Sequence, residues 1–381
     1  MGEAILYDHR NQPLPPTDML PLEYVEKADR SLVAFVSPWA AQYGVVAPET
    51  FYIKDFLQTY GDGTINSVWV YAAVRTLAQT CQQIPISLFT KKGRKLGDMV
   101  DNHPILDFLE RPNPTQTYAD FIEAGVSYFG LGGNFFIGLE GMKDPEDPAA
   151  TPEEMWALRP DKMRIVPEVF DKDRYGTIKM YAVEAGANLD NWPKYFPNEI
   201  LHIKAFSPTN SYWGLPPLSV ARLTILHDTY SREFMTSFFR NGLQTSGVLT
   251  TDFKLNEESF ARMNQQWREL NAGSRNMHKP MILENGLKWT QTTMPPQDVQ
   301  FMQLREMNKA EIVGGVFGLP PAAVGDFKDA SVLANADVQD KVKWEVAVGI
   351  MGRIARVMDE CLLPKFGLDP RQFQLTLDLS D

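Results

Sequence analysis

The chain has 381 residues, of which 44% are hydrophobic and 22% are charged, and its formal net charge is −11. This composition excludes a disordered chain and predicts about two or three packed units. The acidic balance excludes a protein that holds nucleic acid by bulk positive charge, so any contact with nucleic acid must be local.

The residue types that usually carry chemistry are few and scattered. Cys81 and Cys361 lie far apart without metal-ligand spacing, which argues against a disulfide framework or a zinc site and favours a reducing cytoplasm. The five histidines lie in five different segments. The glycine-rich stretch Gly130–Gly133 follows a predicted helix instead of opening one, so it is interpreted as a helix end and not as a phosphate loop. We therefore expect no catalytic residue, no metal and no cofactor.

The first part of the chain shows no sustained periodicity. Residues 1–64 are rich in proline and acidic side chains, so we expect an N-terminal arm that packs on another body or stays mobile. The apolar stretch 32–46 is short and is broken by Pro38, which predicts neither a signal peptide nor a membrane span.

Residues 65–214 alternate between helical and β patterns and predict a mixed α+β unit. The expected helices run from Asn66 to Cys81 and from Thr115 to about Gly130. The expected strands lie at residues 84–90, 134–139, 155–158, 177–183 and 200–206.

The second half of the chain is dominated by long helical patterns. Within residues 215–242, a helix is expected at 218–240, with a row of apolar residues on one face: Leu223, Leu226, Tyr230, Phe234 and Phe238. Residues 243–294 predict a small α/β insert with strands at 246–250 and on either side of Asn285-Gly286, a pair typical of hairpin turns. A second helix is expected within 295–319, from about Asp298 to Phe317. An irregular stretch follows at 320–335, and 336–381 begins with a long helix and ends on a β-like run at 373–379.

Short sequences within these elements, taken in order, carry a family resemblance. They are Trp69–Arg75, Ile84–Ile86, His103–Leu106, Gly132–Asn134, Leu158–Asp161, Gly214–Leu218, Phe238–Gly242, Gly247–Thr250, Leu283–Gly286 and Gly318–Pro321. In this order they resemble the portal proteins of phages with long non-contractile tails, over about residues 65–365. No single piece is specific, and the signal lies in their shared order.

The resemblance implies a portal fold and its division into parts. These parts are an N-terminal arm (1–64), an α+β wing (65–214), a first stem helix (215–242), an α/β clip (243–294), a second stem helix (295–319), a tunnel loop (320–335), and a long helix leading to the wing or crown (336–381). The implied function is a ring of identical subunits, a dodecamer in the virion, which sits at one capsid vertex. This ring would be the conduit for packaging and ejecting double-stranded DNA.

The resemblance also implies partners and a location. The partners are further copies of the chain, double-stranded DNA, the terminase large subunit, a head-tail adaptor, and the major capsid or scaffold protein, with no membrane. The location is the portal vertex of the virion, and the host cytoplasm during assembly.

Two groups of residues are expected to carry this function. Loop residues that would face the DNA channel are Asp326, Lys328, Asp329, Ser331 and Asn335, with Lys328 as the phosphate partner and the two aspartates limiting its grip. Clip residues that would dock the motor and the adaptor are Arg262, Trp267, Arg268 and Arg275. Residues 215–295 carry nine Lys/Arg and seven Asp/Glu, a local charge of +2 on an acidic chain, which favours acidic partner surfaces.

The sequence departs from the family at two places. Ser331 and Asn335 are separated and followed by Asp337, where portals often have a Ser-Asn pair and a glutamate. The chain ends at Asp381, where many relatives continue into a helical crown, so we expect an absent or shortened crown. Two alternatives stay open. One is a head-tail adaptor or capsid-associated protein without a DNA channel, and the other is an enzyme whose site is built from scattered residues.

Overall fold

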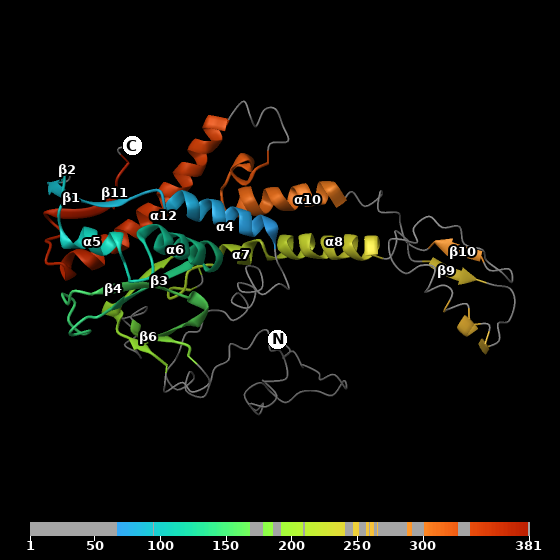
Figure 1. The fold of residues 1–381 in the computed structure, drawn as a ribbon, viewed down its shortest axis with the longest axis horizontal. Helices are drawn as coiled ribbons and strands as arrows, with labels where there is room; N and C mark the ends of the chain where they lie inside the picture. The colour runs from blue at the N-terminus through green and yellow to red at the C-terminus, as the bar shows by residue number, and fades with distance from the viewer. Residues whose placement is uncertain are drawn as a thin grey trace, which may run out of the picture.

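A computed structural model describes residues 67–93, 95–167, 178–185, 192–208, 210–240, 247–250, 257–258, 260–262, 265, 288–291, 301–326 and 336–379. One end of the molecule is a body of helices and small sheets. From this body the helices α8 and α10 run side by side in one direction (Figure 1). The mixture of helices and small sheets confirms the predicted α+β class.

Two helices, α4 (Val68–Cys81) and α6 (Tyr118–Gly132), pack against each other in the centre of the body. The Ser67 hydroxyl caps α4, and Thr117 and Asp120 form a reciprocal capping box that begins α6. Gly133 ends α6 with a φ of 68°, in the left-handed region that favours glycine. Both predicted helices are therefore present, and their capping residues set the first turns two or three positions later than expected.

Three small antiparallel sheets complete the body. In the order β4-β3-β8, strand β3 (Asn134–Glu140) pairs with β4 (Glu154–Leu158) and with β8 (Ile200–Lys204). In the order β11-β1-β2, strand β1 (Ile86–Lys92) pairs with β11 (Phe373–Leu377) and with β2 (Lys95–Met99). The third sheet consists of β5 (Met163–Pro167), β6 (Ile178–Val183) and β7 (Lys194–Tyr195).

The 30-residue helix α12 (Ala336–Lys365) connects the outside of the body to its core. Its first turns project outward (Figure 1), and Val338 and Val342 there are exposed. Further along, Ala347, Met351 and Ile354 are buried in the cluster that also holds α4 and α6. The short helix α5 (Pro104–Glu110) begins at proline, with the His103 ring nitrogen accepting a hydrogen bond from the Ile105 amide.

Several elements differ from the sequence-based expectation. The helix expected at 218–240 is divided at Ala221 into α7 (Pro217–Val220) and α8 (Arg222–Arg240). The helix expected at about 298–317 is α10 (Phe301–Ala310), followed by a π-helical stretch at Glu311–Val316 that contains two adjacent glycines. Strands β2 and β5 were not expected. The β2 residues are mostly exposed and lack the alternating pattern that identifies a half-buried strand.

The junction between the body and the helix pair is held by Asn134. Its side-chain amide donates to the carbonyls of Gly132 and Gly214, and its side-chain oxygen accepts from the Gly214 amide. An added Cβ at Gly133 would lie 2.3 Å from the Leu215 carbonyl oxygen, and one at Gly214 would lie 2.1 Å from the Gly133 carbonyl oxygen. The two backbones can therefore approach this closely only because both positions are glycine.

His202 completes this junction from strand β8. Its Nε2 lies 3.0 Å from the Asn134 side-chain oxygen, and its ring stacks on Phe136 with centroids 4.0 Å apart. Since that oxygen can only accept, Nε2 is the protonated nitrogen of a neutral ring. Burial lowers the pKa of His202 to about 3, and the nearby charge of Lys204 acts in the same direction.

We predict that acid weakens the body through His202. In the unfolded chain a histidine has a pKa of about 6.5. Below that pH the unfolded state therefore binds a proton that the folded state does not bind. Between pH 7 and pH 5 this residue should therefore lower the free energy of unfolding by about 2 kcal/mol, with further loss until the pH reaches its folded pKa. Chemical denaturation of the wild type and of His202→Gln at both pH values checks this. Identical pH dependence in the two proteins would contradict it.

Candidate functional site

Helices α8 and α10 pack together around a buried carboxylate. The Asp228 side chain on α8 is 1% exposed, and its oxygens lie 3.3 Å from Arg232 Nε and 3.5 Å from Arg305 Nε of α10. Asn308 of α10 is also buried, and its amide has no hydrogen-bond partner within the described part of the chain. A buried carboxylate is costly unless it is paired, so the contact of Asp228 with Arg305, which lies on the other helix, favours one relative position of the helices.

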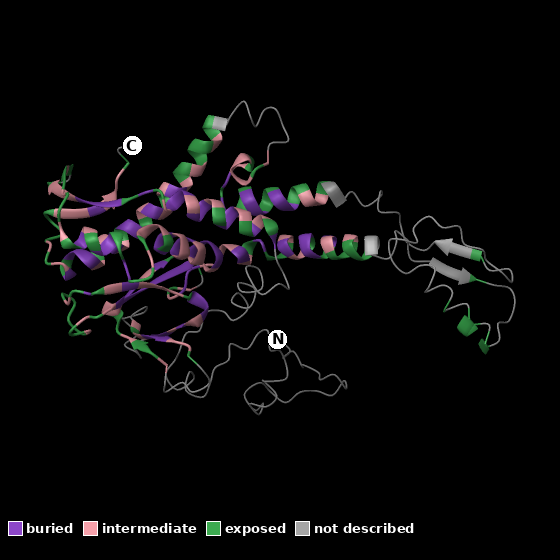
Figure 2. Ribbon diagram, in the orientation of Figure 1, coloured by how far each residue is buried: buried purple, intermediate pink, exposed green. Residues whose placement is uncertain are grey.

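The other side of α8 is apolar and open to solvent. Leu223, Tyr230 and Phe234, three of the five apolar residues predicted to share one face, are exposed. Figure 2 shows exposed residues alternating with buried ones along both α8 and α10. The pair thus has a polar interior and an apolar outer face on α8, the reverse of what a helix in a monomeric protein usually shows.

The start of the predicted tunnel loop is attached to three helices. The Lys309 ammonium of α10 pairs with the Asp326 carboxylate and lies 5.5 Å from the centre of the Trp69 ring of α4. The Thr76 hydroxyl donates to the Ala323 carbonyl at 3.2 Å. On the α12 side, the Ala322 amide donates to the Gln339 side chain at 3.1 Å. Residues 320–326 are therefore held in place by α4, α10 and α12 together.

Of the predicted loop residues, the structure describes only Asp326. Its side chain is 18% exposed, and its charge is engaged by Lys309 inside the chain. The remaining predicted loop residues, Lys328, Asp329, Ser331 and Asn335, lie outside the described residues.

The predicted clip is described in part. Strands β9 (Gly247–Thr250) and β10 (Lys288–Gln291) pair antiparallel beyond the far end of α8 and α10 (Figure 1). Arg262 is exposed in a short helical stretch, close in sequence to the exposed Phe260. The other predicted clip residues, Trp267, Arg268 and Arg275, fall outside the described residues, as does the turn expected at Asn285-Gly286.

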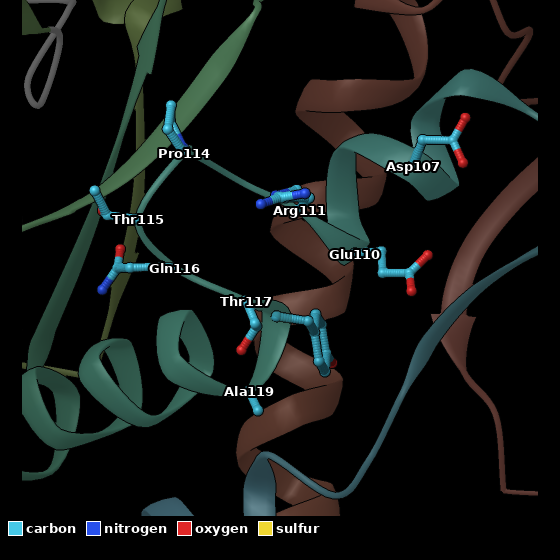
Figure 3. Close-up of a pocket in the computed structure, with 9 residues that line it drawn as sticks. Asp107, Glu110, Arg111, Pro114, Thr115, Gln116, Thr117 and Ala119 are labelled. Atoms are coloured by element: carbon cyan, nitrogen blue, oxygen red, sulfur yellow. The ribbon is translucent and has the colours of Figure 1, made fainter.

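A pocket of about 680 Å³ lies at the edge of the body, between α5 and the start of α6 (Figure 3). The carboxylates of Asp107 and Glu110 extend away from the Arg111 guanidinium. Thr117, which also lines the pocket, is engaged in capping α6. These side chains do not converge on a common point, so the pocket does not present the nucleophile, base and orienting group that catalysis requires.

The described residues hold neither a membrane-spanning helix nor a cluster of metal ligands. None of their helices combines the length and apolar character needed to cross a membrane. They also contain no group of three or more His, Cys, Asp or Glu side chains placed to hold a metal ion together.

The comparison with known proteins decides the family. Residues 68–381 match the family described as phage portal protein. This chain belongs to the phage portal protein family. The portal protein of Enterobacteria phage HK97 is 29% identical over 70% of this chain and 59% of its own length. The probable portal protein of Streptomyces phage phiC31 is 28% identical over 68% of this chain, which spans just over half (54%) of that relative. An uncharacterized protein of Rickettsia bellii is 29% identical, covering 77% of this chain and 74% of its own length.

Solved structures show the same fold. A chain in the neck of a native gene transfer agent particle, computed with C12 symmetry, superposes with a TM-score of 0.61 at 24% identity, covering 90% of this chain and 89% of that one. The HK97 family phage portal protein from Corynebacterium diphtheriae superposes with a TM-score of 0.57 at 14% identity, covering 85% of this chain and 94% of that one. The predicted portal fold is thereby confirmed.

Sequence reasoning missed three residues that organise this portal subunit: Asp228, Arg305 and Lys309. The sequence does indicate an ion pair for Asp228, because Arg232 follows it four residues later on the same helix. Arg305 and Lys309 gave no such signal, because each pairs with a carboxylate on another segment.

We predict that the Lys309–Asp326 pair stabilises the fold more than an exposed pair does. Asp326→Asn leaves a nearly buried ammonium without its counter-charge, so the free energy of unfolding should fall by about 2–3 kcal/mol. The more exposed pair Lys343–Asp340 on α12, in which the Asp340 side chain is 72% exposed, provides the control, since Asp340→Asn should cost less than about 1 kcal/mol. Denaturant unfolding followed by tryptophan fluorescence measures both. Equal losses would mean that burial adds nothing to the Lys309–Asp326 pair.

Proposed function

We propose that this chain is one subunit of a homo-oligomeric ring at a single vertex of a phage capsid, through which double-stranded DNA is packaged and ejected. The observation that carries this proposal is the family match over residues 68–381, together with the fold shared with a neck chain of a twelvefold particle. We infer a structural role and not an enzymatic one, because the family is one of structural proteins.

The shape and charge of the subunit suit such a conduit. The 19 residues of α8 correspond to roughly 28 Å of helix, enough to form a substantial part of a channel wall. With a net charge of −11, each subunit neutralises few phosphates, so DNA is not trapped by counterion release. Loose contact is what a channel for moving DNA needs.

The parts of the fold are assigned accordingly. We assign residues 65–214 to the wing, 215–242 and 295–319 to the stem, 243–294 to the clip and 320–335 to the tunnel loop. The clip then docks the terminase large subunit and later the head-tail adaptor, and the outside of the ring meets the major capsid or scaffold protein. This places the protein in the virion, and in the host cytoplasm during assembly.

Electron microscopy of the purified full-length protein tests the proposal. Rings with a central hole of duplex width are the expected result, and twelve copies are expected in rings taken from virions. Solid discs or small adaptor-like rings without such a hole would favour a capsid-associated protein. A protein that stays monomeric at high concentration and is absent from virion necks would overturn the proposal.

We predict that the clip arginines steer partner docking. Reversing Arg262, Arg268 and Arg275 to glutamate replaces attraction to acidic partner surfaces by repulsion, so motor binding and packaged DNA should fall at least tenfold while rings still form. Three exposed basic residues of the body, Lys95, Lys179 and Arg371, are the matched control, and their reversal should leave packaging unchanged. Unaltered packaging in the clip variant would remove the docking role.

We predict that Lys328 contacts DNA in the channel. Lys328→Glu should leave ring assembly intact but increase the loss of DNA from filled heads, because each subunit then repels the phosphates that it had held weakly. Lys328→Gln, which removes the charge without reversing it, should give a smaller loss of the same kind. The measurement is the DNA content of heads after incubation. Normal retention in both variants would rule out this contact.

A further inference from the structure

The outer face of α8 carries a row of exposed apolar side chains. Leu223, Tyr230 and Phe234 are 69%, 62% and 47% exposed. At about 100° per residue these three positions lie within roughly 20° of one line along the helix. Asp228, whose carboxylate meets Arg305 of α10, lies on the far side of that helix. Single exposed apolar residues are common, but three in one row form a surface that solvent disfavours.

The outer face of α10 has a different character. Gln303, Met307 and Ala310 recur every three or four residues along α10 and are exposed, with Met307 at 53%, and Gly314 in the π-helical stretch that follows is exposed as well. A Cβ added at Gly315 would meet no atom within 4 Å, and one at Gly314 would meet nothing nearer than 3.9 Å. Beyond Gln303 and Met307, Ala310 and the two glycines that follow therefore form a stretch of small residues that allows another helix to approach closely.

The ion pair between the two helices places these faces on opposite sides. Arg305 and Asn308 of α10 point toward α8 and the body, so Met307 and Ala310 point the other way. The α8–α10 pair is consequently a two-helix layer with an apolar surface on one side and a small-residue surface on the other.

A ring of more than two identical subunits must join two different surfaces of each subunit, because contact between identical surfaces closes after two copies. We propose that the α8 outer face (Leu223, Tyr230, Phe234) of one copy packs on the α10 outer face (Met307, Ala310, Gly314) of the next copy. This inference rests on the proposed ring. It specifies the two surfaces that meet between neighbouring copies. Because these surfaces differ, every copy faces the same way around the ring, and α8 and α10 helices alternate around the channel.

Charged substitutions on each face test the pairing. Leu223→Glu with Phe234→Glu, and separately Met307→Glu with Ala310→Glu, should abolish rings. Both variants should keep the circular dichroism of the wild type, because these side chains are exposed in the single chain. Leu96→Glu on β2, an exposed apolar residue far from both faces, is the control and should form rings normally. Rings formed by either double variant at the wild-type concentration would overturn the pairing.

Mixing the two double variants tests its direction. The α8 variant keeps an intact α10 face and the α10 variant keeps an intact α8 face, so together they have one compatible contact. Native mass measurement should show a heterodimer that stops at two copies, while each variant alone stays monomeric. Homodimers of the α10 variant would mean that α8 faces pair with each other, and the absence of heterodimers at a hundredfold higher concentration would also overturn the proposal. If the wild type itself forms no ring, the proposed function fails instead.

Discussion

The buried carboxylate of Asp228 determines how α8 lies against α10. With almost no access to water, this charge is tolerated only because Arg232 approaches it from the same helix and Arg305 from the other. Apolar contacts between two helices allow several similar registers, whereas a buried carboxylate that meets an arginine of the other helix favours one. The outward orientation of Leu223 and Met307 follows from that register, and with it the division of the layer into two unlike surfaces.

The helix pair is useful to a ring only if its angle to the body is fixed, and two attachments fix it. At the start of α7 and α8, Asn134 bonds both backbone groups of Gly214, and the glycines at 133 and 214 allow the two backbone segments to approach. At the end of α10, Lys309 pairs with Asp326 while Thr76 of α4 holds the Ala323 carbonyl. The first and the last residues of the pair are thus attached to the same body, which limits hinge motion between the pair and the body.

Much of this architecture could be predicted from periodicity and capping. The apolar spacing in α4 and α6, the glycine that ends α6, and the strand after it are all local signals, and each was confirmed. What could not be predicted depends on contacts between distant segments. The break at Ala221, the π-helical turn at Glu311–Val316 and the Lys309–Asp326 pair leave no repeated pattern in the sequence. The row of Leu223, Tyr230 and Phe234 was found as a face, but only the position of Asp228 shows that it points outward. The predicted loop and clip residues other than Asp326 and Arg262 stay predictions.

The pairing of β1 with β11 has a consequence for synthesis on the ribosome. The nearest partners in this ladder, Thr90 and Phe373, are separated by roughly 280 residues, so at about 5–20 residues per second the second strand follows the first after some 15–55 s. During that interval one edge of β1 is open to pairing with another chain. Until β11 is made, β2 covers only the other edge of β1, so the open edge is the part of this sheet at which the nascent subunit could aggregate.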